Sequence, residues 1–356
     1  MKLRKLRKLL LSFLAVMTVT IVSVTTNKVY AKAESAGFTV SKVTPENQYR
    51  EAAQFDIKVK PNATQTLALE IKNSENDTKT IDVTPNDSYT NTNGIIVYDK
   101  TSVKKTPTEQ YQFSDLISGK QEVVVGPKKT VKVTFNVKMP ATSFSGIVLG
   151  GFNVQEKVIK EKSESKGIAI TNRFAYVIQA VIRESNTDEN PGPKITIGST
   201  KVALNDLKKV SLQTKIQNVE PIVIGPATIK ATIMAQGSTK VLYSKTMTPV
   251  TFAPNAEFDY ALDLTKANLS AGKYNVHYVV TGNNKSWEAT NPFTITAANV
   301  KSIKSDNNEA KPRATWLLWL IIGIIALLVL LVLFLLFIIL KRRKKDKEEE
   351  KALENK

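Results

Sequence analysis

The chain ends in a stretch that suits a lipid bilayer better than a protein interior. Twenty-five uncharged, mostly aliphatic residues occupy 316–340, and the next five, 341–345, are all Lys or Arg. At about 1.5 Å per residue, a helix of this length exceeds the roughly 30 Å hydrocarbon core of a membrane. Trp316 and Trp319 suit one headgroup layer, and the basic run places the tail 341–356 in the cytoplasm. The sequence predicts one transmembrane helix with the preceding chain outside the cell.

The N-terminus has the pattern of a secretory signal peptide. Five basic residues lie within the first eight positions, and an apolar stretch follows at 9–24. Small residues flank Lys32 in Ala31-Lys32-Ala33, which suits cleavage, and Val29-Tyr30-Ala31 is a second cleavage site of the same kind. We predict a signal peptide over 1–33, and the alternative is an uncleaved N-terminal anchor. Together the two ends describe a single-pass protein of the cell membrane with an extracellular N-terminal portion.

Between these ends the chain carries a modest charge and no cysteine. Of 50 basic residues, 7 lie in 1–33 and 8 in the tail, which leaves 35 against 27 acidic residues. The lysines are scattered along polar faces rather than clustered with aromatic residues, so we predict no nucleic-acid partner. Because disulfides are permitted outside the cell, their absence means that hydrophobic cores provide the stability. The absence of cysteine also favours a bacterial surface protein over a eukaryotic one, because eukaryotic ectodomains of this size usually contain disulfides.

The outer portion alternates apolar and polar residues with a period of two. In 67–72 two leucines and an isoleucine share one face, and in 131–138 four apolar residues oppose four polar ones. Such alternation predicts β-strands, and no helical stripe of any length competes with it. Turn residues, including Asn93-Gly94 and Gly126-Pro127, separate the strands at short intervals. The predicted fold class is all-β, with two tandem immunoglobulin-like β-sandwich domains.

An internal repeat supports two sandwiches. A strand that ends in Asn appears at 67–73 and again at 212–218, and a later alternating strand appears at 130–138 and at 257–264. Residues 186–193 include no apolar side chain to bury and two prolines, which is typical of a linker. The predicted organisation is signal peptide 1–33, first sandwich 34–185, linker 186–193, second sandwich 194–298, a stalk without helix or strand 299–315, transmembrane helix 316–340 and basic cytoplasmic tail 341–356.

One strand, at 174–182, is apolar on both faces. Phe174, Tyr176 and Ile178 share one face, while Val177 and Val181 lie on the other. We interpret the charged residues before it as a hairpin loop and the strand as the last of the first sandwich. Burial between the sheet and a domain junction explains two apolar faces. The alternative is an edge that a partner covers.

The chain offers little for catalysis or for metal binding. Its one histidine, His277, lies on a strand whose buried face is formed by Tyr274, Val276 and Tyr278, so His277 faces solvent. A lone histidine cannot anchor a typical zinc site, and the carboxylates form neither an EF-hand loop nor a compact cluster. We predict no enzyme activity, no catalytic residue, no metal and no cofactor, and the pattern identifies no ligand-binding residue.

Two other segments have both a structural and a functional interpretation. No helix follows the glycine-rich run 146–152, so nothing there would hold a phosphate, and we predict a central strand where glycines allow close packing. The segment 90–94 predicts a turn with positive φ at Gly94 or Asn93. The alternative for 90–94 is a polar surface loop that binds saccharide hydroxyls.

Several short segments together resemble the WxL-interacting protein family of Gram-positive bacteria. In the first half these are 43–48, the strand 65–73, 90–94 with Tyr98, and 139–151. In the second half they are 172–178, 252–255 with Phe258 and Tyr260, 272–274, and Trp287 before Phe293. The resemblance extends from Phe38 to the basic tail. It implies a peptidoglycan-binding domain followed by a host-binding domain. Descriptions of the family begin the second domain near Asn172, so the domain of the strand at 168–183 stays open.

The function that this resemblance implies is that of a non-catalytic cell-surface adaptor. Its first domain would attach to peptidoglycan and to surface proteins that carry WxL domains, and its second to host extracellular proteins. From the residues alone, the alternative is a chaperone-like or pilus-like structural subunit that donates or accepts a strand, which the two-sided strand 174–182 motivates. A wall hydrolase is a third hypothesis, and the scarcity of acid–base groups disfavours it.

Overall fold

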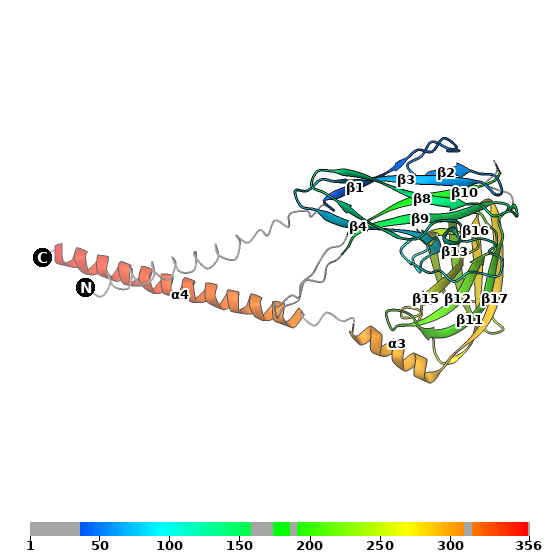
Figure 1. The fold of residues 1–356 in the computed structure, drawn as a ribbon. Helices are drawn as coiled ribbons and strands as arrows, with labels where there is room; N and C mark the ends of the chain where they lie inside the picture. Colours follow the sequence, from blue (N-terminus) through cyan, green and yellow to red (C-terminus); the bar gives the residue numbers. More distant parts are fainter. Residues whose placement is uncertain (1–35, 158–173, 186–190, 310–314, 355–356) are drawn as a thin grey trace.

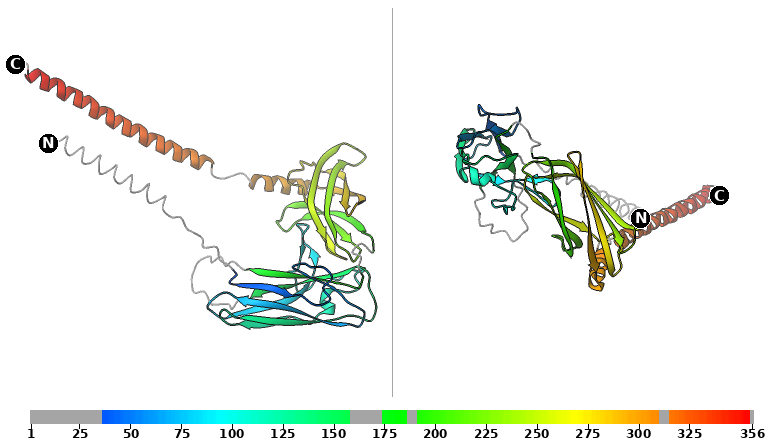
Figure 2. Two further views of the ribbon diagram at one scale, coloured as in Figure 1. Left: turned by 90° about the horizontal axis from the view of Figure 1, so that it is seen from above. Right: turned by 90° about the vertical axis from the view of Figure 1, so that its right-hand side faces the viewer.

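The computed structural model describes residues 36–157, 174–185, 191–309 and 315–354 (Figure 1). The predicted signal peptide, the charged loop before β10 and most of the predicted linker lie outside these ranges. The described chain forms two β-sandwiches followed by two helices. Figures 1 and 2 show the second sandwich attached near one end of the first, with their long axes at an angle.

The first sandwich contains a three-stranded and a five-stranded sheet. The smaller sheet has the order β1 (Phe38–Val43), β3 (Thr64–Asn73), β8 (Thr130–Lys138). The larger has the order β2 (Phe55–Lys58), β10 (Ala175–Arg183), β9 (Ile147–Glu156), β4 (Lys79–Asp87), β7 (Gln121–Val125). A short hairpin of β5 (Tyr89–Thr90) and β6 (Ile96–Val97) and one helical turn, α2 (Phe113–Leu116), lie in the connections. All pairs are antiparallel except β2 with β10.

The second sandwich repeats this order with one strand fewer in the larger sheet. One sheet is β11 (Ile195–Leu204), β12 (Val210–Asn218), β15 (Glu257–Asp263). The other is β14 (Val241–Phe252), β13 (Ile224–Ala235), β16 (Gly272–Gly282), β17 (Lys285–Ile295). The all-β class and the two immunoglobulin-like sandwiches are therefore confirmed.

Alternating side chains build each core between the two sheets. In β8 the inward Val133, Phe135 and Val137 are buried while the residues between them are exposed. Phe152 of the facing sheet lies in the middle of the first core, with ring centroids 4.8 Å from Phe135 and 5.8 Å from Phe55. The Phe55–Phe152 pair is edge-to-face, a geometry that adds to the stability that burial alone gives.

The strand that ends in Asn is a repeated structural device, which we name the Asn clamp. Asn73 ends β3 and Asn218 ends β12, and both are fully buried. In each clamp Oδ1 accepts the backbone N–H two residues on (2.9 and 3.2 Å), and Nδ2 donates to the carbonyl four residues on (2.7 and 2.6 Å). Nδ2 also donates to the carbonyl of Val125, the last residue of β7 (3.1 Å), or of Ala253, the residue after β14 (2.9 Å). The predicted repeat therefore has a shared hydrogen-bonding function.

β10 lies in the first sandwich. It pairs with β9 along its whole length and with β2 from Ala180 to Arg183, which confirms the predicted pairing. Its outward Val181 joins a small apolar cluster that includes Val223 of the second sandwich, so this part of the strand is buried at the domain junction. At the other end of the strand Phe174 and Val177 are 41% and 44% exposed. Burial at a domain junction is therefore confirmed for one part of the strand, and coverage of the exposed part by a partner stays a prediction.

A buried ion pair holds β2 against β10. Arg183 Nε lies 2.7 Å from Asp56 Oδ1, and its second nitrogen lies 3.1 Å from Oδ2. Both side chains are only 3% exposed, and the Tyr49 ring covers the guanidinium at 4.9 Å. The two-pronged geometry is the one in which a buried pair offsets the loss of hydration.

The glycines of β9 allow close packing, as the run 146–152 predicted. A Cβ on Gly150 would lie 2.1 Å from the Phe113 ring, and one on Gly151 would lie 3.0 Å from Tyr98. β9 is also the central strand of its sheet. These glycines therefore admit aromatic rings on the two faces of the sheet, and no phosphate-binding loop is formed.

The prediction of a stalk without regular structure at 299–315 is wrong, because residues Ala297–Glu309 form a helix, α3. Thr296 caps it: Thr296 Oγ1 accepts the N–H of Asn299 (3.2 Å), and Asn299 Oδ1 accepts the N–H of Thr296 (2.9 Å). The sequence carried this signal as a capping box with Asn in the third position. Buried Ile303 packs α3 onto the second core, so tertiary contact stabilises a helix with little amphipathic pattern.

The last helix, α4, runs from Thr315 to Glu354 and includes the predicted transmembrane segment and most of the basic tail. Within it Ile322–Lys344 is long and apolar enough to cross a membrane. Its side chains are not buried against the sandwiches, and Leu327, for example, is 67% exposed. A bare apolar helix of this length is consistent with a membrane anchor.

Candidate functional site

The β5–β6 hairpin docks the first sandwich onto the second. Thr90 Oγ1 donates to Thr251 O (3.1 Å) and accepts the N–H of Ala253 (2.9 Å). Thr251 N donates in turn to Gly94 O (2.8 Å). Gly94 has φ +73, and a Cβ there would lie 3.0 Å from the Val250 side chain, so the predicted positive φ is confirmed. Thr90 and Gly94, two residues of the predicted turn for which saccharide binding was the alternative, are therefore used in the domain junction.

Two further hydrogen bonds, both accepted by backbone carbonyls of the second sandwich, fix this junction. Thr106 Oγ1 donates to Asn255 O (2.7 Å) from the loop that follows β6. Ile147 N donates to Pro221 O (2.7 Å) from the start of β9. A Cβ on Gly146 would lie 2.2 Å from the same Pro221 oxygen, so the close approach requires a glycine. The junction is a polar and specific one, with the Val181 cluster as its apolar centre.

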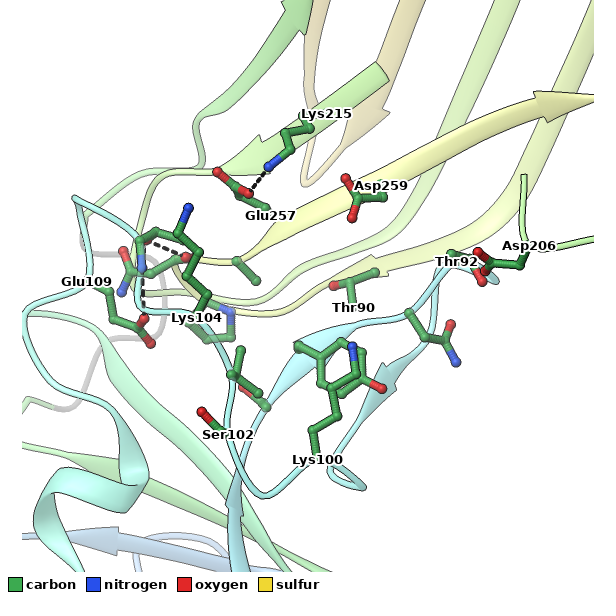
Figure 3. A pocket seen from close by; sticks show the side chains of 18 residues that line it. Thr90, Thr92, Lys100, Ser102, Lys104, Glu109, Asp206, Lys215, Glu257 and Asp259 are labelled. Atoms are coloured by element: carbon green, nitrogen blue, oxygen red, sulfur yellow. Dashed lines mark hydrogen bonds and ion pairs between the residues drawn. The ribbon is translucent and has the colours of Figure 1, made fainter. Parts of the chain in front are cut away.

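A groove opens between the sandwiches beside this junction (Figure 3). It consists of a cavity of about 440 Å³ and an adjoining one of about 740 Å³. The first sandwich contributes Thr90, Thr92, Lys100, Ser102, Lys104 and Glu109 to its walls, and the second contributes Asp206, Lys215, Glu257 and Asp259. We call this set the interdomain groove. Its size is in the range of small-molecule sites.

The interdomain groove presents ammonium and carboxylate groups together. Lys215 Nζ lies 2.6 Å from Glu257 Oε2, whereas no described residue forms an ion pair with Lys104. Lys100 Nζ lies 3.9 Å above the Tyr89 ring in a cation–π arrangement. The Lys100 side chain is nevertheless exposed to solvent. The lining therefore suits a ligand with hydroxyls and charges of both signs.

Glu109 is a carboxyl group of the groove whose pKa is shifted toward neutral pH. Burial raises the pKa of Glu109 to about 7, and Asp87 pushes it in the same direction. The opposing hydrogen bonds are those that Oε2 accepts from Thr106 N (3.3 Å) and Gln112 Nε2 (3.1 Å). Near neutral pH the Glu109 carboxyl is therefore present in both protonation states, and the charge of the groove changes in that range.

His277 lies away from the interdomain groove, on the outer face of β16. Its Nδ1 is 3.0 Å from Thr290 Oγ1 and its Nε2 is 3.7 Å from Glu288 Oε2, both on β17. The side chain is 34% exposed, as the strand pattern predicted. Among the described residues no group of three or more His, Cys, Asp or Glu lies together in a way that could hold a metal ion. The expectations of no enzyme activity and no metal stay predictions.

Sequence reasoning identified only one part of the groove. The segment 90–94 was a candidate, and of its side chains Thr92 lines both cavities. Asn91 is occupied within the turn, because its Oδ1 accepts the N–H groups of Asn93 and Ile95 (3.0 and 3.2 Å). Lys104, Glu109 and the residues of the second sandwich had no signal, since they are distant in the sequence and single charges are common on β-sandwiches.

Two family models match the chain one after the other. Residues 38–156 match the peptidoglycan-binding domain of the WxL Interacting Protein, and residues 165–305 match its host-binding domain. The chain belongs to the WxL-interacting protein family. Its two matched regions are thus described as binding peptidoglycan and host, which fits a cell-surface role, and the interdomain groove lies between them.

The boundary between the family models differs from the boundary between the folds. The host-binding match begins at residue 165 and therefore includes β10, whose pairing partners β2 and β9 lie in the first sandwich. β10 thus belongs to the first fold although the second family region includes it. Dividing the chain at residue 165 would remove a strand from the first sandwich.

Comparison with other proteins adds little beyond the family. No curated protein matches the chain. Among solved structures, the class 5 fimbriae chaperone CfaA is 10% identical over 71% of this chain and 98% of its own, with a TM-score of 0.26. The Pseudomonas aeruginosa CupB2 chaperone is 11% identical over 64% of this chain and 91% of its own, with a TM-score of 0.24. Likeness at such scores carries no argument about fold or function.

Proposed function

We propose that this WxL-interacting protein is a non-catalytic adaptor of the cell envelope. α4 holds it in the membrane with both sandwiches outside the cell. It tethers proteins with WxL domains to peptidoglycan, and its second sandwich also binds host ligands. The observation that carries the proposal is the tandem match to a peptidoglycan-binding and a host-binding domain on a chain with a membrane-compatible helix.

Co-sedimentation of the full chain tests the adaptor role. The chain, solubilised in detergent, is mixed with insoluble peptidoglycan, with a purified WxL-domain protein, and with both. We expect the chain in the peptidoglycan pellet, and the WxL-domain protein in that pellet only when the chain is present. Failure with both ligands rejects the adaptor. Release of soluble muropeptides from the pellet would instead reveal a hydrolase.

We assign the peptidoglycan contact to the interdomain groove. Peptidoglycan combines sugar hydroxyls with peptide amines and carboxylates, and the groove offers hydroxyls, lysines and carboxylates to match them. Lys104, exposed and without an ion-pair partner among the described residues, and Lys100, held over Tyr89, are the two cations that the first sandwich offers to a ligand. Their charge would add to affinity at low salt in particular.

Paired variants test the groove. Lys100→Ala combined with Lys104→Ala removes both cations, and Lys72→Ala combined with Lys132→Ala removes two exposed lysines from the smaller sheet of the first sandwich. We expect at least a tenfold loss of peptidoglycan binding for the groove variant and less than twofold for the control. Equal losses would show that binding follows net charge and that the groove is not the site.

A second candidate function is strand complementation, which the edge of β10 favours. Among the described strands, only β9 pairs with residues 175–179, because β2 reaches no further than Ala180, and Val177 is 44% exposed there. An incoming strand would cover these groups. Hydrogen exchange of the amides at 175–179 in the presence of a WxL-domain protein tests it, and protection equal to that of the free chain contradicts it.

A further inference from the structure

The end of the second sandwich opposite the junction residues Pro221 and Asn255 gathers three loops, 205–209, 236–240 and 264–271. We call this set, with the residues that border it, the distal end. Leu264 N donates to Val210 O (3.1 Å), which joins the first and third loops, and Gln236 N donates to Lys273 O (3.1 Å), which places the second loop there too. Gly272 pairs with Ile295, the residue just before the cap of α3. Figure 1 shows α3 leaving the sandwich at this end.

The distal end exposes apolar side chains. Outside α4, the exposed large hydrophobic residues of the described chain number eight, and four of them border these loops. They are Leu204 (54%), Leu207 (75%), Val241 (54%) and Leu242 (43%). Leu207 is the most exposed of the eight and lies at the tip of the β11–β12 turn. Single exposed apolar residues are ordinary, but four at one end of a domain form a candidate contact surface.

The same end carries a positive charge. Lysines outnumber aspartates five to two among the charged residues at the distal end, and Glu is absent there. The residues are Lys208, Lys209, Lys240, Lys266 and Lys273 against Asp206 and Asp263. Lys209 Nζ lies 4.0 Å from Asp263 Oδ2, and Asp206 lines the interdomain groove. Exposed leucines beside lysines are the pattern of surfaces that rest on anionic bilayers.

The length of chain between α3 and α4 limits how far the distal end can lie from the membrane. α3 is attached to the second core through Ile303 and ends at Glu309, and α4 begins at Thr315. Five residues separate the helices, and at no more than about 3.6 Å per residue they span roughly 20 Å. A domain held this close to a bilayer meets its headgroups repeatedly.

We infer that the distal end is a second membrane-contact site, which inserts Leu207 and Val241 at the bilayer surface and holds its lysines against anionic headgroups. The inference rests on the proposed anchoring by α4. With two points of attachment the second sandwich has a fixed inclination to the membrane, and the first sandwich is directed outward. Burial of the apolar tips and attraction of the lysines act together, and the second contribution weakens with salt.

The absence of cysteine makes a direct test possible. Single variants Leu207→Cys, Val241→Cys, Val124→Cys and Leu328→Cys of the full chain receive an environment-sensitive fluorophore. They are reconstituted in vesicles of equal parts phosphatidylcholine and phosphatidylglycerol. We expect the emission of the probes at 207 and 241 to shift to shorter wavelength and to be quenched by lipids with a spin label on the acyl chain. Val124, 62% exposed on the first sandwich, is the control, and its probe should show neither effect.

The Leu328 probe separates failure of the inference from failure of the anchor. If it is quenched while positions 207 and 241 behave like 124, α4 spans the bilayer and the distal end stands clear of it, which overturns the inference. If the 328 probe is not quenched, the anchoring fails and the inference fails with it. A blue shift at 207 that appears equally in detergent and rises with protein concentration would assign the surface to a second copy of the chain instead.

A charge-reversal pair tests the contribution of the lysines. Lys208→Glu combined with Lys209→Glu should reduce quenching at 241 by at least half in these vesicles. The matched control is Lys128→Glu combined with Lys129→Glu, two adjacent lysines in the β7–β8 turn, where Lys128 has φ 57 and Lys208 has φ 62. Unchanged quenching in the first variant would overturn the electrostatic part of the inference.

Discussion

The two sandwiches share one strand order and one Asn clamp, but they close the edges of their sheets in different ways. In the first, β2 lies beside β10 as a short parallel strand, and the buried Asp56–Arg183 pair holds it. In the second, β17 pairs with β16 on one edge, and no described strand pairs with its other edge. There Asn291 of β17 instead donates to Gly198 O (2.7 Å) on β11, where the pairing of β11 with β12 is irregular.

This difference shows that the repeat preserves the strand order and the Asn clamp but not the way in which the sheet edge is closed. Strand order and the clamp depend on alternation and on one buried amide, which the chain repeats in both halves. Edge closure depends on charged residues in one sandwich and on neutral contacts in the other. The first sandwich therefore has a stability that depends on two buried charges, and the second does not, so the two should respond differently to the same kind of change.

The largest expected effect is that of Arg183→Ala. It leaves the Asp56 carboxylate buried without its main partner, and such losses amount to about 3–5 kcal/mol. Hydrogen exchange of the full chain in detergent should show faster exchange throughout the first sandwich and unchanged exchange in the second. Asp56→Leu combined with Arg183→Met should lose much less. Equal losses in both sandwiches would contradict their energetic independence.

The next largest loss of stability is expected from substitutions in the two Asn clamps, which form a matched pair. Asn73→Ala and Asn218→Ala each leave buried carbonyls without a donor, and we expect about 2–4 kcal/mol from each variant in its own sandwich. With Trp316 and Trp319 replaced by Phe, the fluorescence of Trp287 reports the second sandwich, while circular dichroism in urea reports both. Asn→Asp at either position keeps the acceptor but removes the Nδ2 donor, so a loss close to that of Ala supports the donor bonds. A negligible effect at one position would show that the repeat is not functional.

A smaller effect is expected where α3 meets the second sandwich. Ile303→Ala removes three buried carbon atoms, worth about 2 kcal/mol at roughly 0.8 kcal/mol each. The Ile303→Ala substitution should expose residues 297–309 to protease and lower the stability of the second sandwich only. Lys301→Ala, on the exposed side of the same helix, should change neither. Resistance to cleavage in Ile303→Ala would show that contacts other than Ile303 hold the helix.

The smallest effect concerns Glu109 at the junction. Because its pKa rises from 4.5 to about 7 on folding, the folded state holds this proton more tightly than the unfolded state. The associated stability is full below about pH 4.5 and is lost as pH rises through about 7. The loss is on the order of 1 kcal/mol after allowance for screening by solvent. In Glu109→Gln the urea midpoint should depend less on pH over this range than it does in the unchanged chain. An equal dependence on pH in both would contradict the raised pKa of Glu109.

Much of the fold could be read from the sequence because strands leave a periodic trace. The alternation at 131–138 and the repeat of 67–73 at 212–218 predicted β8, β3 and β12 correctly. The prediction of a stalk at 299–315 was wrong because α3 leaves no such periodic trace. It has no apolar stripe, and Ile303 is its one buried residue among those whose burial is described. Helices held by tertiary contact give weak periodicity, and only the capping box marked this one.

The candidate site could be predicted only in fragments. Thr92 belonged to a segment with polar side chains, whereas Lys104, Glu109 and Asp259 were indistinguishable from any other charged residue of a β-sandwich. They acquire a shared environment only when the sandwiches dock through Thr90 and Thr106. A groove between domains has no signature in either domain's own pattern.

The sequence by itself determined that this chain forms two cysteine-free sandwiches and one apolar helix suited to a bilayer, because alternation and hydropathy are local properties of the chain. Only the tertiary structure decided which sandwich contains β10, which charges are buried as a pair, and which side chains meet in the interdomain groove. Those outcomes depend on contacts between residues more than a hundred positions apart, such as Asp56 and Arg183. No local pattern encodes a pairing over that distance.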